Sequence, residues 1–275
     1  MSAIKKKLQF PSAPSFEFTI EYVNIPYFSE RDEFPLHIHN TLEIYLNLSG
    51  KVSFMVENQT YPISRGSVII TKPFEYHHCI YHNHLQHEHY CIRISNCEEL
   101  ELLSQFINRE KGKHNHIGLT EEQTLSLKKH LDILISMEKR SYIDQYYHFI
   151  RVLQIIGNNS ATMESDYADN IPQNLKKVLN IISTQYASRL TVASLAAEIF
   201  VSVGTLERQF KKYLNTSPTE YIKRKRLAEA MRLLIQGISV SQVAYQCGFP
   251  DASNFIKVFK KNFGHPPYQY MKLMK

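Results

Sequence analysis

Apolar and polar residues alternate with a period of two through the first third of the chain. Between about residues 16 and 94, short segments rich in Ile, Val, Phe and Tyr are separated by turn signals such as Leu48-Ser49-Gly50. The clearest alternation places Leu42, Ile44, Leu46 and Leu48 on one face of a strand and Thr41, Glu43, Tyr45 and Asn47 on the other. The pattern predicts an all-β unit whose strands meet apolar packing on one side and a polar interior or solvent on the other.

From Cys97 onward the apolar residues recur at helical spacing. We expect helices at about residues 98–108, 121–140 and 141–156. Beyond a turn-rich stretch, the rest of the chain is predicted to be helical, at about residues 173–187, 192–199, 203–214, 218–236, 240–246 and 252–263, with a short helix from Pro267. Ser217 and Ser239 begin capping sequences that set the starts of two of these helices.

These patterns predict a multidomain α+β protein. We expect an N-terminal domain over residues 1–157, a linker over residues 158–172 that is poor in large apolar residues, and an all-α domain over residues 173–275. The helices between about residues 120 and 156 would either pack against the β unit or pair two subunits.

The C-terminal half contains the same phrase twice, about 48 residues apart. The matched pairs are Val192 and Val240, Ala196 and Ala244, Phe210 and Phe259, Lys211 and Lys260, Lys212 and Lys261, Pro218 and Pro267, and Tyr221 and Tyr270. A small residue where two helices cross, a core Phe behind the second helix and lysines after it are typical of a helix-turn-helix. The repeat predicts two such units, joined by a linker helix over 218–236 that is long enough to span about one turn of DNA.

Charge separates the two halves of the chain more sharply than the net charge of +6 indicates. Residues 172–275 carry 16 Lys and Arg against 5 acidic residues, a balance of +11, and the remainder has a balance of −5. This asymmetry indicates a polyanion-binding module joined to a module with another role. The basic half shows no arrangement of a catalytic nucleophile and base, so we do not expect an enzyme.

The chain lacks an apolar run long enough to cross a membrane, and its start is basic without an apolar stretch behind it. Its four cysteines show no CxxC pairing, which suits reduced thiols. We therefore expect a soluble, cytoplasmic protein with no membrane partner.

The first turns of each second helix are expected to reach base edges in the major groove, and the lysines that follow are expected to meet phosphates. Arg208 suits a guanine edge, Asn254 an adenine edge and Ile256 a thymine methyl group. The candidate DNA-binding residues are Ser202, Gly204, Thr205, Glu207, Arg208, Lys211, Lys212, Asp251, Ser253, Asn254, Ile256, Lys257, Lys260 and Lys261. Leu206, Phe210, Phe255 and Phe259 lie on the opposite face and are expected in the core.

Residues 173–273 resemble the DNA-binding domain of the AraC/XylS family of bacterial transcription regulators. The resemblance rests on Val201-Ser202, Leu206 to Lys211, Arg226, Ala230, Leu233-Leu234, Val243-Ala244, Gly248-Phe249, Phe255, Phe259-Lys260-Lys261, Gly264 and Pro267. Three residues depart from the family pattern: Asn215 stands in place of Gly, and Lys257 and Met271 each stand in place of Arg. Because Lys lacks the fork geometry of Arg, base discrimination by the second unit is in question.

That resemblance implies a regulator that binds double-stranded promoter DNA and a small-molecule effector, without a cofactor. It also implies a homodimer, a link to sugar or related metabolism, and RNA polymerase as a further candidate partner. A protein that coats DNA without sequence preference is an alternative.

The N-terminal half contains a second pattern, resembling the first motif of the cupin barrels. His37, His39, Glu43 and Gly50 have the spacing of that motif, and His77 follows at a position like that of its second motif. We therefore expect a cupin-like β-barrel whose effector-binding candidates are His37, His39, Glu43, Tyr45, Glu75, Tyr76 and His77. The alternative is a metal site formed by His37, His39, Glu43 and His77, in a metal sensor or an enzyme fused to a DNA-binding domain.

A further histidine cluster crosses a predicted hairpin: His77, His78, His82, His84, His87 and His89. Alternating histidines at a strand turn are expected to be exposed or tuned in pKa rather than bound to metal.

Overall fold

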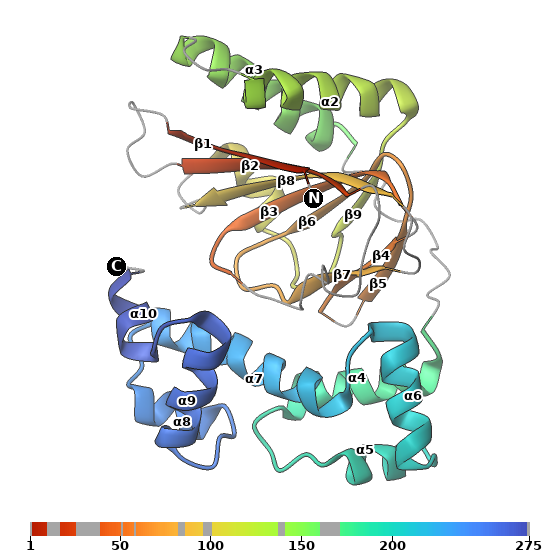
Figure 1. The fold of residues 1–275 in the computed structure, drawn as a ribbon, viewed down its shortest axis with the longest axis vertical. Helices are drawn as coiled ribbons and strands as arrows, with labels where there is room; N and C mark the ends of the chain where they lie inside the picture. The colour runs from red at the N-terminus through yellow and green to blue at the C-terminus, as the bar shows by residue number, and fades with distance from the viewer. Residues whose placement is uncertain are drawn as a thin grey trace. The chain divides into compact units, whose positions relative to one another are not determined.

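The computed structural model describes residues 2–9, 17–25, 39–50, 52–57, 59–81, 86–95, 101–136, 141–159 and 171–273. The chain divides into two compact units, residues 1–170 and 171–275 (Figure 1). The first unit is rich in β-strands and the described part of the second is helical, as the predicted α+β class requires. No helix in the described ranges combines the length and the apolarity needed to cross a bilayer.

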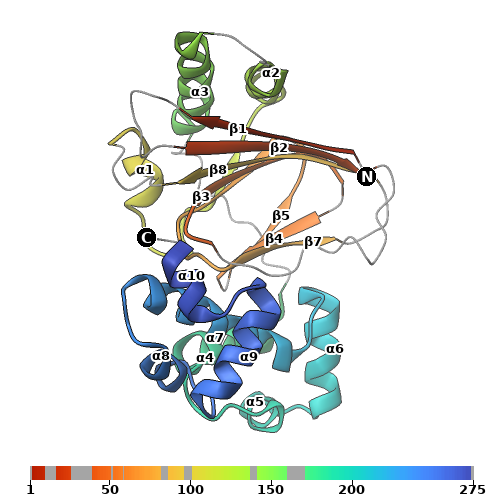
Figure 2. The same ribbon diagram turned by 60° about the vertical axis from the view of Figure 1, so that its left-hand side comes forward.

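Two antiparallel sheets form the body of the first unit. The larger sheet has the strand order β1-β2-β8-β3-β6-β9, with β1 (Ser2–Gln9), β2 (Glu17–Ile25), β3 (Leu42–Ser49), β6 (Ser67–Thr71), β8 (His87–Ser95) and β9 (His116–Gly118). The smaller sheet has the order β5-β4-β7, with β4 (Val52–Val56), β5 (Gln59–Ile63) and β7 (His77–Tyr81). Figure 2 shows the smaller sheet lying across from the larger one, so the predicted barrel takes the form of two facing sheets.

The two faces of β3 have the environments that its alternation predicts. Leu42, Ile44, Leu46 and Leu48 belong to an apolar core on the outer face of the larger sheet. Tyr45 belongs to a second core between the sheets, and Glu43 and Asn47 are buried on that same inner face. The polar side of the strand therefore faces an interior rather than solvent.

Two helices cover the outer face of the larger sheet, α2 (Glu121–Ser136) and α3 (Tyr142–Gly157) (Figure 1). Leu127, Leu131 and Leu134 from α2 are fully buried there, at the helical spacing seen in the sequence. Phe149 from α3 stacks on Phe18 from β2, with ring centroids 4.4 Å apart. These helices therefore pack against the β unit.

The second unit has seven described helices. They are α4 (Gln173–Gln185), α5 (Val192–Glu198), α6 (Val203–Leu214), α7 (Pro218–Ile235), α8 (Val240–Gln246), α9 (Ala252–Phe263) and α10 (Pro267–Leu273). α5 and α6 form the first helix-turn-helix, α8 and α9 form the second, and α7 joins them (Figure 1). The Ser217 and Ser239 side chains accept hydrogen bonds from Glu220 N and Gln242 N, which confirms both predicted caps.

The fold differs from the predicted elements at three places. Residues 2–9 form the edge strand β1, although their sequence shows no alternation, because pairing with β2 uses backbone groups alone. Residues 116–118 form the short strand β9 against β6. The helix predicted at residues 98–108 is reduced to a 3-10 turn (Glu101–Leu103) and α1 (Ser104–Ile107), and residues 96–100 and 137–140 lie outside the described ranges.

Candidate functional site

A small cavity of about 40 Å³ lies between the two sheets of the first unit. The larger sheet supplies Glu21, Val23, Glu43, Tyr45, His89, Cys91 and Arg93 to its walls, and the smaller sheet supplies Phe54, Cys79 and Tyr81. The volume suits one or two water molecules and lies well below the roughly 300 to 1,000 Å³ of most ligand pockets. A larger ligand therefore requires the walls to move apart.

A guanidinium between two carboxylates dominates the electrostatics of this cavity. Glu43 and Arg93 are direct neighbours in the β3–β8 register, and Arg93 Nε donates to Glu43 Oε2 over 2.9 Å. Arg93 Nη1 lies 3.7 Å from Glu21 Oε2 on β2. Since one cation faces two anions, the group suits a ligand with several hydroxyls that can both donate and accept hydrogen bonds.

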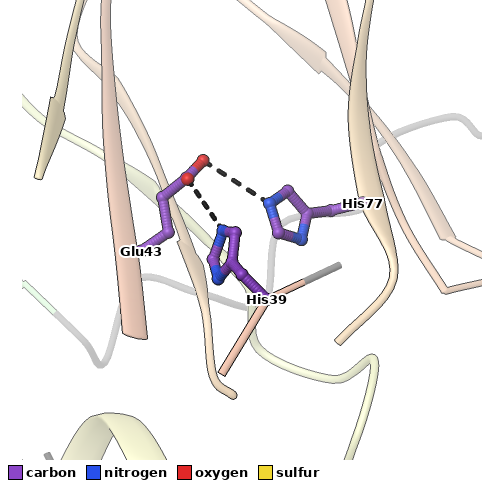
Figure 3. Close-up of side chains that lie close together, drawn as sticks. All are labelled: His39, Glu43 and His77. Carbon is purple, nitrogen blue, oxygen red and sulfur yellow. Dashed lines mark hydrogen bonds and ion pairs between the residues drawn. The ribbon is translucent and has the colours of Figure 1, made fainter. Parts of the chain in front are cut away.

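Two histidines approach Glu43 as well (Figure 3). His39 Nε2 lies 3.0 Å from Glu43 Oε2, and His77 Nε2 lies 3.5 Å from Glu43 Oε1. Burial acts to raise the pKa of Glu43, but the hydrogen bonds from His39 and His77 outweigh it and hold that pKa well below its usual value. Glu43 is therefore an ionised carboxylate whose two oxygens both have partners.

The donor types of His39, Glu43 and His77 match those of a transition-metal site, and their ligand atoms lie within 4.8 Å of one another. The position of Arg93 does not fit a metal. Its Nε contacts the same Glu43 oxygen that His39 contacts, so a metal ion on that oxygen would lie beside a second positive charge. The fourth predicted ligand, His37, lies outside the described residues.

Tyr45 lies at the centre of a buried aromatic group on the cavity wall. Its hydroxyl is 3.0 Å from His87 Nε2, and its ring contacts Phe54 and His89 with centroid separations of 4.9 and 4.8 Å. Burial lowers the pKa of His87 to about 4 and that of His89 to about 3, so both imidazoles are neutral near pH 7. Rings of this kind provide apolar faces next to the charged Arg93 group.

Glu75 is an effector candidate that the structure places elsewhere. Its carboxylate is fully buried and accepts two hydrogen bonds from Arg109, at 2.8 and 2.5 Å. The Gly112 and Lys72 backbone N–H groups and Asn115 Nδ2 donate to it as well, at 2.7, 2.9 and 3.0 Å. Because five donors occupy the two oxygens, Glu75 is a structural anchor between β6 and residues 109–115 rather than a cavity residue.

The structure also shows where Tyr76 and the histidine cluster of the first unit lie. Tyr76 is buried but is not among the residues that line the cavity. His77, His78, His87 and His89 are at most 5% exposed, so exposure, one of the two properties expected of this cluster, is wrong for these four; the other, a shifted pKa, is found for His77, His87 and His89. The cause is that β7 and β8 are buried on both faces; His82 and His84 lie outside the described residues.

The sequence did contain a signal for the cavity residues that we missed. His89, Cys91 and Arg93 alternate with apolar residues along β8, so they share the inner face of the sheet. A charged residue flanked by apolar residues in a strand, as Arg93 is between Ile92 and Ile94, indicates a polar interior. Cys79 and Cys91 are buried free thiols, and burial raises the pKa of Cys79 to about 12, which leaves its thiol protonated.

In the second unit, α6 and α9 are the second helices of the two helix-turn-helix units, and we call them the first and second readers. α6 presents the predicted polar residues of the first reader. Ser202 caps the helix by accepting from Thr205 N over 3.1 Å. Arg208 folds back over that first turn, where its Nε donates to Gly204 O and its Nη2 to Thr205 Oγ1, both over 3.2 Å. Leu206 and Phe210 on the opposite face are fully buried, as expected. The Arg208 guanidinium is thereby held over the exposed start of α6.

The second reader, α9, has the same construction with a different cap. Asp251 accepts from Asn254 N over 2.7 Å, and Phe255 and Phe259 are fully buried. The exposed side chains of α9 include Ser253, Asn254, Lys257, Lys260 and Lys261, and Ile256 is half-buried. Lys211 and Lys212 are likewise exposed at the end of α6. The structure thus places every predicted DNA-binding residue of both helices away from the core.

The basic run on α7 has mixed roles. Lys225 is buried and lies 3.4 Å from Glu229, and Arg224 bonds Glu220 over 2.7 Å. Arg226 Nε donates to the Tyr186 carbonyl over 2.8 Å. Part of the run therefore serves the fold of the unit.

Two family models match the chain. Residues 28–132 match the AraC-like ligand binding domain, and residues 195–273 match a helix-turn-helix domain. The HTH-type transcriptional activator RhaS of Escherichia fergusonii is 26% identical over 242 residues, which cover 85% of this chain and 86% of that relative. RhaS of Salmonella schwarzengrund is 24% identical over 242 residues, which cover 85% of this chain and 86% of that relative.

Solved structures of similar proteins cover the helical unit or the whole chain. The C-terminal domain of the response regulator yesN from Fusobacterium nucleatum is 32% identical, covers 35% of this chain and 95% of its own, and has a TM-score of 0.34. ToxT from Vibrio cholerae is 16% identical, covers 94% of this chain and 98% of its own, and has a TM-score of 0.39.

Proposed function

We propose that this chain, which belongs to the AraC family of DNA-binding transcription regulators, binds its promoter with both helix-turn-helix units and responds to a sugar-like effector in the N-terminal unit. One observation carries the DNA-binding part. The two capped helices α6 and α9 each present an exposed polar first turn and terminal lysines, with the apolar side of each helix buried. That is the construction of a pair of recognition helices.

The linker helix sets the reach of the two readers. With 18 residues, α7 is about 27 Å long, close to the roughly 34 Å of one DNA turn once the flanking residues are included. α6 and α9 would then enter successive major grooves on one face of the duplex. Such a protein acts where promoter DNA is, in the cytoplasm of a bacterium, and RNA polymerase is its candidate partner there.

Footprinting and competition test this function. We expect protection of two neighbouring major-groove segments per subunit, and a preference of about 1,000-fold or more for the promoter site over random duplex at fixed salt. Protection of a single segment would contradict the paired docking. Equal affinity for promoter and random duplex would instead indicate a protein that coats DNA without sequence preference.

The composition of the cavity supports the effector proposal. Arg93, Glu43 and Glu21 offer both donors and acceptors to hydroxyl groups, and Tyr45 and Phe54 offer aromatic faces to the apolar side of a sugar ring. The RhaS relatives are consistent with a regulator of carbohydrate metabolism. Since the cavity is only about 40 Å³, the effector must move its walls on entry, which would couple binding to a change in shape.

A panel of sugars and sugar acids, measured by thermal shift, identifies the effector. A ligand present at 100 times its Kd stabilises the native state by about 2.7 kcal/mol. We expect Arg93→Met to abolish that thermal shift. Arg65→Met should retain it, because Arg65 is exposed in the same unit and does not line the cavity. An equal response in both variants would place the effector outside this cavity.

The metal-binding alternative has its own test, because the cluster of His39, Glu43 and His77 favours it on donor type. Elemental analysis of purified protein would show stoichiometric metal that Glu43→Gln loses. We expect no such metal, because Arg93 occupies the charge-balancing position beside Glu43.

A further inference from the structure

A groove of about 350 Å³ lies in the helical unit where the two helix-turn-helix units meet, and we call it the junction groove. One wall comes from residues 190–192 at the start of α5, and another from the first half of α7. The third wall comes from Phe249 and Pro250 and from the inner side of α9. The groove therefore has walls from both helix-turn-helix units, through the start of α5 and through α9, and from the helix that joins them.

The walls of the junction groove are held in a fixed arrangement. Arg226 on α7 donates through Nε to the Tyr186 carbonyl and through Nη2 to the Ser188 carbonyl, both over 2.8 Å. On the side of residues 186–188 away from Arg226, Gly248 packs against Ala187. A Cβ at Gly248 would be only 2.4 Å from the Ala187 carbonyl oxygen. The backbone of residues 186–188, next to the groove wall at residues 190–192, is thus held between α7 and the turn that joins α8 to α9.

The chemistry of the lining suits a phosphodiester chain. Its polar residues are Thr191, Thr219, Lys223, Arg226 and Asn254, and no carboxylate lines it among residues 171–273. Its floor is apolar, with Ile222 and Phe249 both buried. Hydroxyl, amide and cationic donors above an apolar floor match the phosphates and the deoxyribose rings of a nucleic acid backbone.

The groove also lies next to the surface that would meet DNA. Asn254 belongs both to the lining and to the exposed first turn of α9. When two recognition helices enter successive major grooves, the backbone between those grooves must run past the residues between the helices. Those residues are the walls of the junction groove.

We propose that the junction groove receives the DNA backbone between the two major-groove segments, with Lys223 exchanging its ion pair with Glu220 for a phosphate. This proposal rests on the DNA-binding function proposed above. Because the walls belong to both helix-turn-helix units, a backbone segment in the groove contacts both units at once. The groove would therefore make affinity depend on the spacing between the two segments as well as on their sequences.

The salt dependence of binding tests the proposal on the full chain, with a random duplex of about 30 base pairs, roughly three helical turns. Each phosphate contact contributes about −0.9 to the slope of log K against log salt. Lys223→Gln should therefore bind more weakly than the wild type at about 50 mM salt, and the ratio of the two affinities should shrink about 3.5-fold on raising the salt to about 200 mM. Lys177→Gln, which removes the same charge from an exposed site on α4, is the matched control and should keep the wild-type slope.

A second pair of variants introduces a charge in place of removing one. Thr219 is exposed on the groove wall, so Thr219→Glu should weaken DNA binding about tenfold at low salt through repulsion of the phosphates. Thr184→Glu, at an exposed Thr of α4 outside the lining, should leave binding within about twofold of the wild type. Circular dichroism melting checks that all four variants fold.

The outcomes separate the two proposals. If the wild type shows no salt-dependent DNA binding, the proposed function itself fails. If the wild type binds but Lys223→Gln keeps the full slope and Thr219→Glu binds normally, the function stands and the junction groove does not hold the backbone. Free inorganic phosphate that competed with DNA at equal concentration would point to a small-anion site instead.

Discussion

Asn215 ends α6 in the left-handed backbone conformation, with φ at 50°, and Gly264 ends α9 in the same way, with φ at 78°. The backbone N–H of each bonds the carbonyl four residues earlier, at Lys211 and Lys260. Asn enters this conformation more readily than other residues with a Cβ, which explains how the first helix-turn-helix has Asn215 in place of the glycine of the family pattern without losing the helix end. The two copies of the repeat therefore end their second helices in the same conformation, although one uses Asn215 and the other Gly264.

Gly248 and Gly264 both have positive φ, but only Gly248 is in close contact with another segment. A Cβ at Gly248 would overlap the backbone of Ala187, whereas a Cβ at Gly264 meets nothing within 4 Å. We expect Gly264→Ala to lower the free energy of unfolding by about 1 kcal/mol, from backbone strain alone, and Gly248→Ala to lower it by more than about 2 kcal/mol. Urea unfolding followed by circular dichroism measures both, and equal losses would show that the Ala187 contact is unimportant.

Arg208 and Lys261 are expected to act differently on DNA. Arg208 is held over the first turn of α6, where base edges would lie, while Lys261 is exposed in the last turn of α9. Arg208→Ala should lose roughly 1 to 3 kcal/mol at one base position of the promoter site, and Lys261→Ala should weaken all sequences alike. Binding to the promoter duplex, its single-base variants and random duplex distinguishes the two effects. A uniform loss for Arg208→Ala would make it a phosphate contact.

The buried histidines predict a stability that falls with acid. Burial lowers the pKa of His87 and of His116 to about 4, from about 6.5 in the unfolded chain. Between these values the unfolded state binds protons that the folded state excludes, so the free energy of unfolding falls as the pH drops from about 7 to about 4, by roughly 3 kcal/mol per histidine. Denaturant unfolding across this range measures the slope. His87→Gln should reduce that slope, and an unchanged slope would show that His87 is not the titrating group.

At the scale of elements, α3 has two apolar faces. Phe149, Val152, Leu153 and Ile156 pack into the core of the first unit. Ile143, Tyr147 and Ile150 lie on the other side at spacings of four and three, and they are 78%, 56% and 41% exposed. A contiguous exposed apolar stripe on a helix indicates a protein interface. We infer that this stripe pairs two copies of the chain, as expected for a homodimer.

Ile143→Asp tests the pairing of two α3 helices. The side chain is exposed in the monomer, so a carboxylate there should leave the fold intact but disrupt a packed apolar interface. We expect the variant to be a monomer by light scattering under conditions where the wild type is a dimer. Ser136→Asp, at an exposed position of α2, should remain dimeric. A dimeric Ile143→Asp variant would locate the interface elsewhere.

At the scale of the whole molecule, the two units have separate cores and separate chemistry. The cavity with Arg93 belongs to residues 1–170, and both readers belong to residues 171–275. An effector bound in the first unit would therefore act from outside the unit that contacts DNA, so its effect on binding would be allosteric. Such coupling requires a different affinity of the effector for two states of the protein.

The separated helical unit provides the test. Residues 171–275 should bind the promoter with the same sequence preference as the full chain, but about 100-fold or more weakly if two full chains pair on the promoter, because the separated unit would lack the contacts of the second chain. The effector should not change this binding. Gel-shift titration with and without effector measures it, and a response of the isolated unit would mean that the effector acts on the readers directly.

The sequence by itself determined the helical unit almost completely. Contacts between residues three or four apart are local in the chain. They determine the helix starts at Ser202, Ser217 and Ser239, and they determine which positions of α6 and α9 are buried. The repeat in the sequence then predicted the arrangement of the unit, because two copies of one helix-turn-helix pattern fold into two similar helix pairs. The alternation in β3 likewise predicted its two faces.

Only the tertiary structure decided the composition of the cavity. Its walls combine residues from positions 21 to 93, which strand pairing brings together, and a register is a relation between distant segments that alternation within one strand does not specify. Glu75 and Arg93 show the consequence. Both are charged residues of the β unit, yet the pairing of β3 with β8 places Arg93 on the inner face, and the packing of residues 109–115 holds Glu75 away from it.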